Sequence, residues 1–460
     1  MTDLFDVAII GAGVVGCAVA RHLSHNQLSV ALIEARNDVG AGTSKANTAI
    51  LHTGFDAVPG SIESRLVARG YQLLRAYAPT VGISIEETGA VLVAWDDEQA
   101  ANLPTLVDKA LTNGYHQTQL IDATTVREME PHLGDGITGG MLVPGEHLID
   151  PWSTPIAFAT EAVANGCRLV TDLQVVELEV GPDVTRLIGA DGREVLTRFV
   201  VNAAGLHGDL VHRLFGFDGF TIRPRRGELI VFDKLARPLL GRTILPVPTS
   251  HTKGVLIAPT VFGNIMVGPT ADDVDDKNAT GSTRAGLDNL LRKGYRILPA
   301  LLEEEVTAVY AGLRAATEHS DYQIEWDAGA RYVCLGGIRS TGLTSSMGLA
   351  EEASTMLSTA LTITPKPADQ RHLIRLAPLG EFGERPYQRG GTVLCHCERV
   401  TAEEIDAALA APLPARDLDG LRRRTRVLAG RCQGFYCSAA VCGRAAAASN
   451  RPISEWIGLA

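Results

Sequence analysis

The chain has 460 residues, a net charge of −11 and an apolar content of 45%, which is ordinary for a globular protein. This length allows roughly three domain-sized units, and the negative charge argues against a general nucleic-acid binder. No apolar run approaches the ~18 residues that span a bilayer, and the N-terminus lacks a basic-then-apolar signal sequence. We therefore expect a cytoplasmic protein, at most peripheral on the inner face of the cell membrane, with no nucleic-acid partner.

A strand, a glycine-rich turn and a helix open the chain. The run Asp6–Ile10 predicts a short buried strand, and GAGVVG at 11–16 leads into a helix that reaches about His25. A second strand over Ser29–Ile33 ends on Glu34. A G-x-G-x-x-G motif alone is weak evidence, but together with both strands, the helix and the terminal acid it predicts a dinucleotide site.

Each residue of this motif has a physical role in such a site. Gly11 allows the tight turn, Gly13 lets backbone amides approach a pyrophosphate, and Gly16 lets the helix pack on the strand. The amides and dipole at the helix N-terminus attract phosphate. Glu34, 18 residues after Gly16, is placed to accept hydrogen bonds from a ribose.

The choice between FAD and NAD depends on the rest of the chain. No second motif of this kind appears, which favours one permanently held dinucleotide, with NAD as the alternative. The segments FVVNAAGLHGD (199–209) and CLGGIRSTGLTSSMGLAEEAS (334–354) resemble the flavin-contacting turns of the glycine/D-amino-acid oxidase superfamily. The resemblance implies an FAD cofactor with contacts from Thr43, Ser44, Ala204, Gly205, Gly337, Gly342, Leu343 and Thr344.

This resemblance implies an α/β fold in which a Rossmann-type FAD-binding domain is interleaved with an antiparallel-sheet substrate lobe. We expect the FAD-dependent part to occupy residues 1–363, with the substrate lobe mainly in 80–150 and 220–325. Strand-like runs at 227–232 and 254–258 support that sheet. Four prolines mark a linker over 364–390, and a small helical domain follows over 391–455.

The segment Gly42–Gly70 is similar to the corresponding segment of two enzyme groups, the FAD-dependent glycerol-3-phosphate dehydrogenases and the L-2-hydroxyglutarate oxidases and dehydrogenases. Both groups carry the His-x-Gly that is found here at His52. Phe55 and Ile338 depart from the Arg and Lys of the glycerol-3-phosphate enzymes. The G-I-x-S-x-G-L-T of the late turn and the P-x-R-G at 224–227 resemble the hydroxyglutarate group instead.

Oxidation of a secondary alcohol by flavin requires a base for the hydroxyl proton and a cation for an anionic substrate. The resemblance implies His52 as the base, with a structural histidine or a covalent flavin attachment as the alternatives. Arg314, in an A-G-L-R that fits both groups, is the first candidate for binding the substrate anion. Arg226 and Lys253 follow.

Four cysteines near the C-terminus form a pattern, with Cys395 and Cys397 as C-x-C and, 34 residues later, Cys432 and Cys437 as C-x4-C. Thiolates bind soft metals and iron–sulfur clusters. Zinc sites usually have C-x2-4-C at both ends, so C-x-C fits zinc poorly. Nothing marks the chain as secreted, which makes disulfides the weaker alternative.

The segment from Gly391 to about Ala446 resembles the small [2Fe–2S] domain of bacterioferritin-associated ferredoxins. It is closer to the version of this domain that is fused to anaerobic glycerol-3-phosphate dehydrogenases. The resemblance implies a [2Fe–2S] cluster held by the four cysteines. The remaining thiols, Cys17, Cys167, Cys334 and Cys442, lie in apolar or Ala-rich runs and are expected to be packed residues.

The basic group Arg422, Arg423, Arg424 and Arg426 in this domain is either a docking site for an acidic partner or a solvated helix face. The first hypothesis for the whole chain is an FAD dehydrogenase for a small anionic hydroxy compound, whose cluster passes electrons to a partner subunit or quinone. An amine or amino-acid dehydrogenase, and an electron-transfer subunit of a larger complex, are the alternatives. Such a protein is expected to form an oligomer or a hetero-complex.

Overall fold

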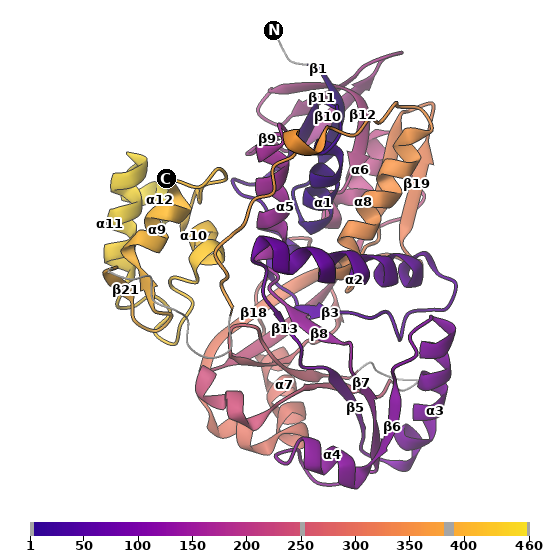
Figure 1. Cartoon of the computed structure of the whole chain (residues 1–460), viewed down its shortest axis with the longest axis vertical. Coiled ribbons are helices and arrows are strands. Elements are labelled where there is room, and N and C mark those ends of the chain that lie inside the picture. Colours follow the sequence, from indigo (N-terminus) through magenta and orange to yellow (C-terminus); the bar gives the residue numbers. More distant parts are fainter. Residues whose placement is uncertain (1–3, 249–253, 381–390, 458–460) are drawn as a thin grey trace.

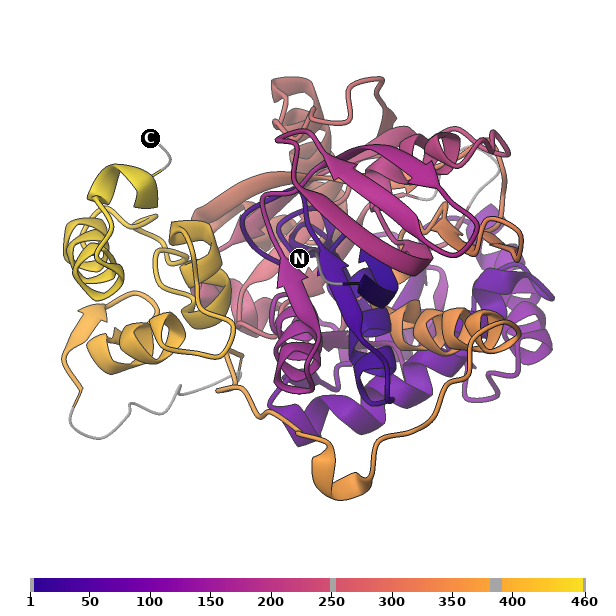
Figure 2. The ribbon, with the colours of Figure 1, turned by 90° about the horizontal axis from the view of Figure 1, so that it is seen from above.

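The computed structural model describes residues 4–248, 254–380 and 391–457. Two large sheets carry most of the strands, and a small C-terminal domain lies beside both of them (Figures 1 and 2). No helix of these described residues is long and apolar enough to cross a membrane.

The first sheet has a parallel centre. Its strands run in the order β10 (Val175–Val180), β11 (Thr185–Gly189), β12 (Glu194–Asn202), β1 (Leu4–Ile10), β2 (Val30–Ile33) and β9 (Arg168–Val170). The last residues of β12 also pair in parallel with β20 (Tyr332–Gly336), which β19 (Gln323–Asp327) extends. Strands β1 and β2 are near-continuous apolar runs, as expected for parallel strands that are covered on both faces.

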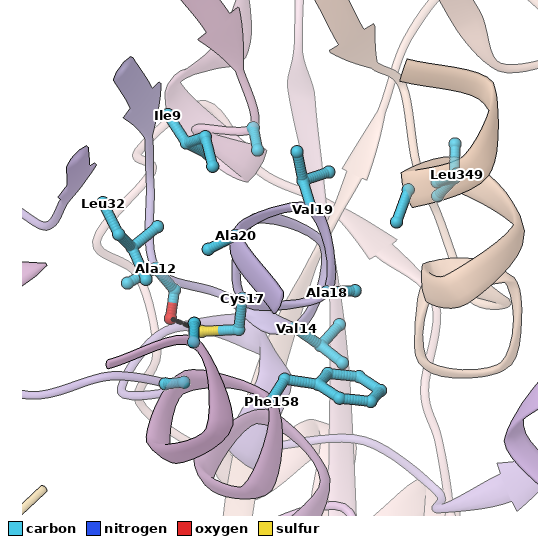
Figure 3. Close-up of a cluster of buried hydrophobic side chains, with 14 of the residues drawn as sticks. Ile9, Ala12, Val14, Cys17, Ala18, Val19, Ala20, Leu32, Phe158 and Leu349 are labelled. Atoms are coloured by element: carbon cyan, nitrogen blue, oxygen red, sulfur yellow. Dashed lines mark hydrogen bonds between the residues drawn. The ribbon is translucent and has the colours of Figure 1, made fainter. Parts of the chain in front are cut away.

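Four helices pack together beside this sheet: α1 (Val14–Ser24), α2 (Ile62–Val81), α5 (Ser153–Ala164) and α8 (Gly342–Ser358). Helix α1 lies between Phe158 of α5 and Leu349 of α8, and its Cys17 thiol donates a hydrogen bond to the Ala12 carbonyl (Figure 3). Cys17, Cys167, Cys334 and Cys442 are all buried, which confirms that they are packed residues.

The second sheet is antiparallel apart from one parallel pair, β5 with β14. Its order is β6 (Gln119–Asp122), β7 (Gly139–Val143), β5 (Ala90–Ala94), β14 (Thr243–Pro246), β15 (Leu256–Pro259), β16 (Ile265–Gly268), β13 (Arg223–Phe232) and β18 (Val306–Ala316), with β17 (Asp272–Asp273) also on β13. Helices α3 (Asp97–Thr112), α4 (Ala123–Met129) and α7 (Arg284–Ile297) pack against it.

A small third sheet lies between these two layers and positions the site. Strand β8 (His147–Ile149) pairs antiparallel with both β3 (Ile50–Leu51) and β4 (Ile85–Glu86). Ile50 and Leu148 also belong to a buried cluster with residues of the second sheet. The short strands are therefore held from both sides.

The C-terminal domain contains β21 (Val393–Cys395), β22 (Val400–Thr401), α9 (Ala402–Leu409), α10 (Leu418–Thr425), α11 (Ser438–Ser449) and α12 (Ile453–Trp456). Helix α9 begins with a capping box, in which Thr401 and Glu404 satisfy each other's backbone amides. Before this domain, residues 364–380 follow the surface of the part formed by the first sheet and its helices. There, Leu376 N donates to Val81 O and Lys366 N donates to His25 O.

Candidate functional site

The predicted glycine turn joins β1 to α1. Gly11 has a φ of 103°, and a Cβ there would lie 2.5 Å from the Ala203 carbonyl oxygen. A Cβ on Gly16 would lie 1.8 Å from the Gly11 carbonyl oxygen. Both positions therefore require glycine, and the turn leads directly into the N-terminus of α1, where a pyrophosphate binds in such folds.

Two side chains line the same turn. Ser44 Oγ accepts a hydrogen bond from Val14 N at 2.9 Å, and Glu34 Oε2 accepts one from Ala12 N at 2.8 Å. Burial raises the pKa of Glu34 above its usual value, although backbone N–H groups oppose the shift. Glycines at the turn, a hydroxyl at the helix N-terminus and a carboxylate at the end of β2 fit a dinucleotide.

The other two predicted cofactor-contacting turns reach this region from distant parts of the chain. Ala203 N donates to Ile10 O at 2.9 Å, which places Ala204 and Gly205 beside the Gly11 turn. The late turn contains Gly337, at a φ of 63°, and leads into α8. Its predicted contacts lie at the start of that helix: Gly342, Leu343 and Thr344.

Thr344 and Thr43 connect the cofactor side to the substrate side. The buried Thr344 hydroxyl accepts a hydrogen bond from His52 N at 3.0 Å and donates one to Ile50 O at 3.3 Å. Thr43 Oγ1 donates to Leu313 O at 2.8 Å, which brings β18 against the turn that contains Ser44. The structure thereby joins the His52 segment to the α8 turn, and the residue before Arg314 to the Ser44 turn.

His52 follows β3 and forms a hydrogen-bonded pair with Glu146. In the β3–β8 register Leu51 faces His147, so the next residues in register are His52 and Glu146. His52 Nδ1 lies 2.8 Å from Glu146 Oε1, and Glu146 Oε2 accepts from Thr53 N at 2.6 Å. Burial acts to lower the pKa of His52, but the adjacent Glu146 carboxylate outweighs it and raises this pKa above the usual value.

This geometry gives His52 the arrangement of a general base. The Glu146 carboxylate accepts the Nδ1 proton, which leaves Nε2 without a proton in the neutral ring. Sequence reasoning missed Glu146, which lies 94 residues from His52 in the chain. The register of β3 with β8 is the only signal that joins them, and strands of two and three residues are too short to be recognised from a pattern.

The candidate anion-binding residues differ in their partners. Arg314 is partly buried, its Nη1 donates to Thr270 O at 3.3 Å, and no carboxylate of the described residues forms an ion pair with it. Burial and the nearby Arg225 lower its pKa. Arg226, in contrast, lies 3.3 Å from the buried Glu228. Lys253 lies outside the described residues.

The four predicted cluster ligands meet as two pairs. The Cys397 thiol lies beside Cys432, and the Cys437 thiol lies beside Cys395. Within the described part of the chain, no three Cys, His, Asp or Glu side chains are arranged to hold a single metal ion. Two thiol pairs fit a binuclear cluster, in which each iron takes two thiolates.

Backbone amides around the thiols support the same interpretation. The amides of Tyr436 and Gly434 donate to the Cys432 sulfur and lower the pKa of that thiol. The Leu428 amide donates to Cys437, although burial raises the pKa of this thiol to about 12. Hydrogen bonds to the sulfurs are one of the means by which proteins stabilise and tune iron–sulfur clusters.

The arginine group of α10 and the residues after it does not form a solvated face. Arg423 and Arg426 are buried, and Arg423 and Arg424 donate to Asp38, a buried residue in the loop after Glu34. The solvated-face interpretation is therefore wrong for these residues. Arg423 and Arg424 have their acidic partner, Asp38, in the FAD-binding part of the same chain, whereas Arg426 donates to Glu398 within its own domain.

Two family models match the chain. The model for FAD-dependent oxidoreductases matches residues 6–356, and the model for BFD-like [2Fe-2S] binding domains matches residues 393–443. The chain belongs to the FAD-dependent oxidoreductase family. This FAD-dependent oxidoreductase therefore combines an FAD-binding fold with a C-terminal [2Fe-2S] binding domain, and the expectation of FAD rather than NAD is confirmed.

Individual relatives extend this result. A glycerol 3-phosphate dehydrogenase of Caloramator mitchellensis is 35% identical over 95% of the oxidoreductase and 92% of its own length. The bovine mitochondrial L-2-hydroxyglutarate dehydrogenase is 30% identical over 59% of this chain and 61% of its own. The dithionite-reduced, FAD-bound L-alpha-glycerophosphate oxidase of Mycoplasma pneumoniae superposes with a TM-score of 0.76 at 27% identity, covering 80% of this chain and 98% of its own.

Proposed function

We propose that this oxidoreductase is a glycerol 3-phosphate dehydrogenase whose electrons leave through its C-terminal cluster. The His52–Glu146 pair carries the proposal, because an oriented imidazole is the group that oxidation of an alcohol requires. The similarity to the Caloramator enzyme supports the substrate, since it extends over 95% of this chain and so includes the C-terminal domain.

The residues have distinct roles in this proposal. His52 Nε2 accepts the proton of the secondary hydroxyl, while Glu146 holds the ring in the required tautomer. Arg314 binds the phosphate dianion through its fork of donors, which no carboxylate occupies among the described residues. Holding the substrate at both ends fixes its C–H bond relative to the ring of the cofactor.

The cofactors supply the redox chemistry: FAD takes up the hydride equivalent, and the [2Fe–2S] cluster carries electrons singly to an acceptor subunit or quinone. The four cysteines hold the cluster in this proposal. The ion pairs from Asp38 to Arg423 and Arg424 hold the C-terminal domain against the FAD-binding loop, so that the two centres keep a fixed relation.

Oxidation of L-2-hydroxyglutarate is the second candidate. The late turn, G-I-R-S-T-G-L-T over 337–344, and the likeness to the bovine enzyme favour it. A carboxylate would take the place of the phosphate at Arg314, because a guanidinium binds either anion through the same pair of donors.

An anaerobic titration separates these candidates. The flavin absorption of the purified protein is followed as glycerol 3-phosphate or L-2-hydroxyglutarate is added. Bleaching by glycerol 3-phosphate alone is the expected result. Bleaching by L-2-hydroxyglutarate alone would replace the first candidate by the second, and bleaching by neither would overturn both.

A further inference from the structure

Two aromatic side chains protrude beside the cluster-binding cysteines. Phe435 and Tyr436 are 82% and 80% exposed, more than any other large apolar side chain among the described residues. Their rings are in edge-to-face contact, with centroids 5.2 Å apart. Neighbouring, solvated aromatic rings of this kind are characteristic of the central contacts of protein–protein interfaces.

The aromatic pair is attached directly to a predicted ligand. Both residues lie in the four-residue segment between Cys432 and Cys437, and the Tyr436 amide donates a hydrogen bond to the Cys432 sulfur. A protein that contacts these rings would therefore lie within a few residues of the cluster. Short separations of this kind are what electron transfer between proteins requires.

The other contacts of the C-terminal domain face the rest of the chain. Arg431, just before the aromatic segment, donates to Asp233 at 2.6 Å, and Lys234 donates to Glu398 at 3.0 Å. Together with the α10 ion pairs to Asp38, these contacts fix one side of the domain against both the substrate lobe and the FAD-binding part. The aromatic pair remains exposed while that side is occupied.

We propose that Phe435 and Tyr436 form the docking point for a one-electron acceptor protein that presents an uncharged, apolar surface over its redox centre. This inference rests on the proposed function, because it places the exit of electrons at the cluster. Each encounter moves one electron from the reduced cluster to the oxidised acceptor, without a proton and without any bond made or broken.

The size of the patch favours a transient acceptor over a second copy of the chain. Two aromatic side chains contribute roughly 150–250 Å² each, well below the ~800 Å² per partner of a stable complex. Redox encounters occupy the small end of that range. The segment Gln433–Tyr436 carries no charge and forms no amphipathic helix, which distinguishes it from a surface built for an anionic membrane.

The test uses the full-length protein with its cluster reduced by dithionite, so that docking is measured whether or not the flavin feeds the cluster. Reoxidation is followed by stopped flow with a blue-copper protein whose copper lies beneath an apolar patch. We expect Phe435→Ala/Tyr436→Ala to lower the second-order rate constant at least tenfold, and salt to change the wild-type rate less than twofold. Tyr295→Ala, which removes another exposed ring, is the matched control and should leave the rate unchanged.

An unchanged rate in the double variant would overturn the proposal. Two further results for the double variant would also overturn it, if the acceptor rate stayed intact. Loss of binding to phosphatidylcholine–phosphatidylglycerol vesicles would mean that the patch serves a membrane. Loss of a dimer in sedimentation would mean that it serves a second copy of the chain. Ferricyanide and the cluster's EPR signal report whether the variant still holds a functional cluster. Substrate-driven reduction of the cluster is measured separately, so that failure of the proposed function is seen independently.

Discussion

Asp38 Oδ2 accepts a hydrogen bond from Arg423 Nη2 at 2.6 Å, and 385 residues of chain separate the two. Asp38 belongs to the loop between Glu34 and Ser44, which lines the predicted dinucleotide site, whereas Arg423 belongs to the cluster domain. Arg424 adds two hydrogen bonds to the same carboxylate, at 2.7 and 2.8 Å. One of the contacts that hold the cluster domain is thus made by the loop that joins Glu34 to Ser44, the two side chains lining the predicted dinucleotide site.

Asp38→Asn should release this contact. Arg424 would lose its buried counter-charge and Arg423 would keep only Asp419, and breaking a buried pair in this way costs about 3–5 kcal/mol. We expect a lower unfolding midpoint for the cluster domain and faster release of FAD, measured by visible circular dichroism and by flavin fluorescence. Asp406→Asn removes an exposed Asp–Arg pair within the same domain and should leave both signals unchanged.

The same contact should respond to acid. Burial acts to raise the pKa of Asp38, but the two arginines outweigh it and hold this pKa below its usual value. A carboxylate with a lowered folded-state pKa contributes its full stability above the unfolded value of ~3.9, and that stability is lost as the pH falls through the lowered pKa. The midpoint difference between wild type and Asp38→Asn should therefore be constant near neutral pH and shrink below about pH 4.

His52→Ala should lower kcat/KM roughly 10²- to 10⁴-fold, the usual contribution of a general base. Because Glu146 raises the pKa of His52, the wild-type rate should rise with pH through a value above the ordinary histidine pKa of ~6.5. Glu146→Gln should also slow the enzyme, since an amide can donate to Nδ1 and move the proton onto Nε2. The measurement is the pH dependence of steady-state kcat/KM.

The two variants carry their own controls. In Glu146→Gln the remaining activity should titrate at lower pH than in wild type, because the negative charge that raises the His52 pKa is gone. An unmoved titration would mean that another group is the base. Acid precipitation tests the covalent alternative for His52, and the expected result is that FAD is released into the supernatant.

The sequence predicted those parts of the site that depend on local chain geometry. The turn at Gly11 and the carboxylate at Glu34 follow from a short strand–turn–helix pattern. Glu146 and Asp38 could not be found in this way. Each gains its role from a partner that only tertiary pairing brings close, 94 residues away for Glu146 and 385 for Asp38. The arginines of α10 resemble a solvated face in the sequence for the same reason, since the acidic surface that covers them belongs to another domain.

Arg314→Ala should raise KM for glycerol 3-phosphate roughly ten- to a hundredfold, because a charge-assisted hydrogen bond contributes about 1.5–3 kcal/mol. Arg314→Lys should recover part of this loss, since a point charge attracts the phosphate without the paired donors of a guanidinium. Initial rates with a dye acceptor give KM and kcat. Arg226→Lys keeps the positive charge opposite Glu228 and should leave KM close to the wild-type value. If Arg226→Lys instead raised KM more than Arg314→Ala does, Arg226 would be the anion-binding residue.

Cys397→Ser tests whether the cluster lies on the route of electrons. The change removes a thiolate from one of the two thiol pairs, so the absorption and EPR signal of the [2Fe–2S] cluster should disappear while FAD stays bound. Cys442→Ala is the control, because this thiol lies on the buried side of α11. This variant should retain the cluster, measured as equal amounts of iron and acid-labile sulfide. Glycerol 3-phosphate should still bleach the flavin of Cys397→Ser, because the substrate site lies in the other part of the chain. Reduction of a protein acceptor should be lost, and a retained rate would place the cluster off the route and make it a structural element.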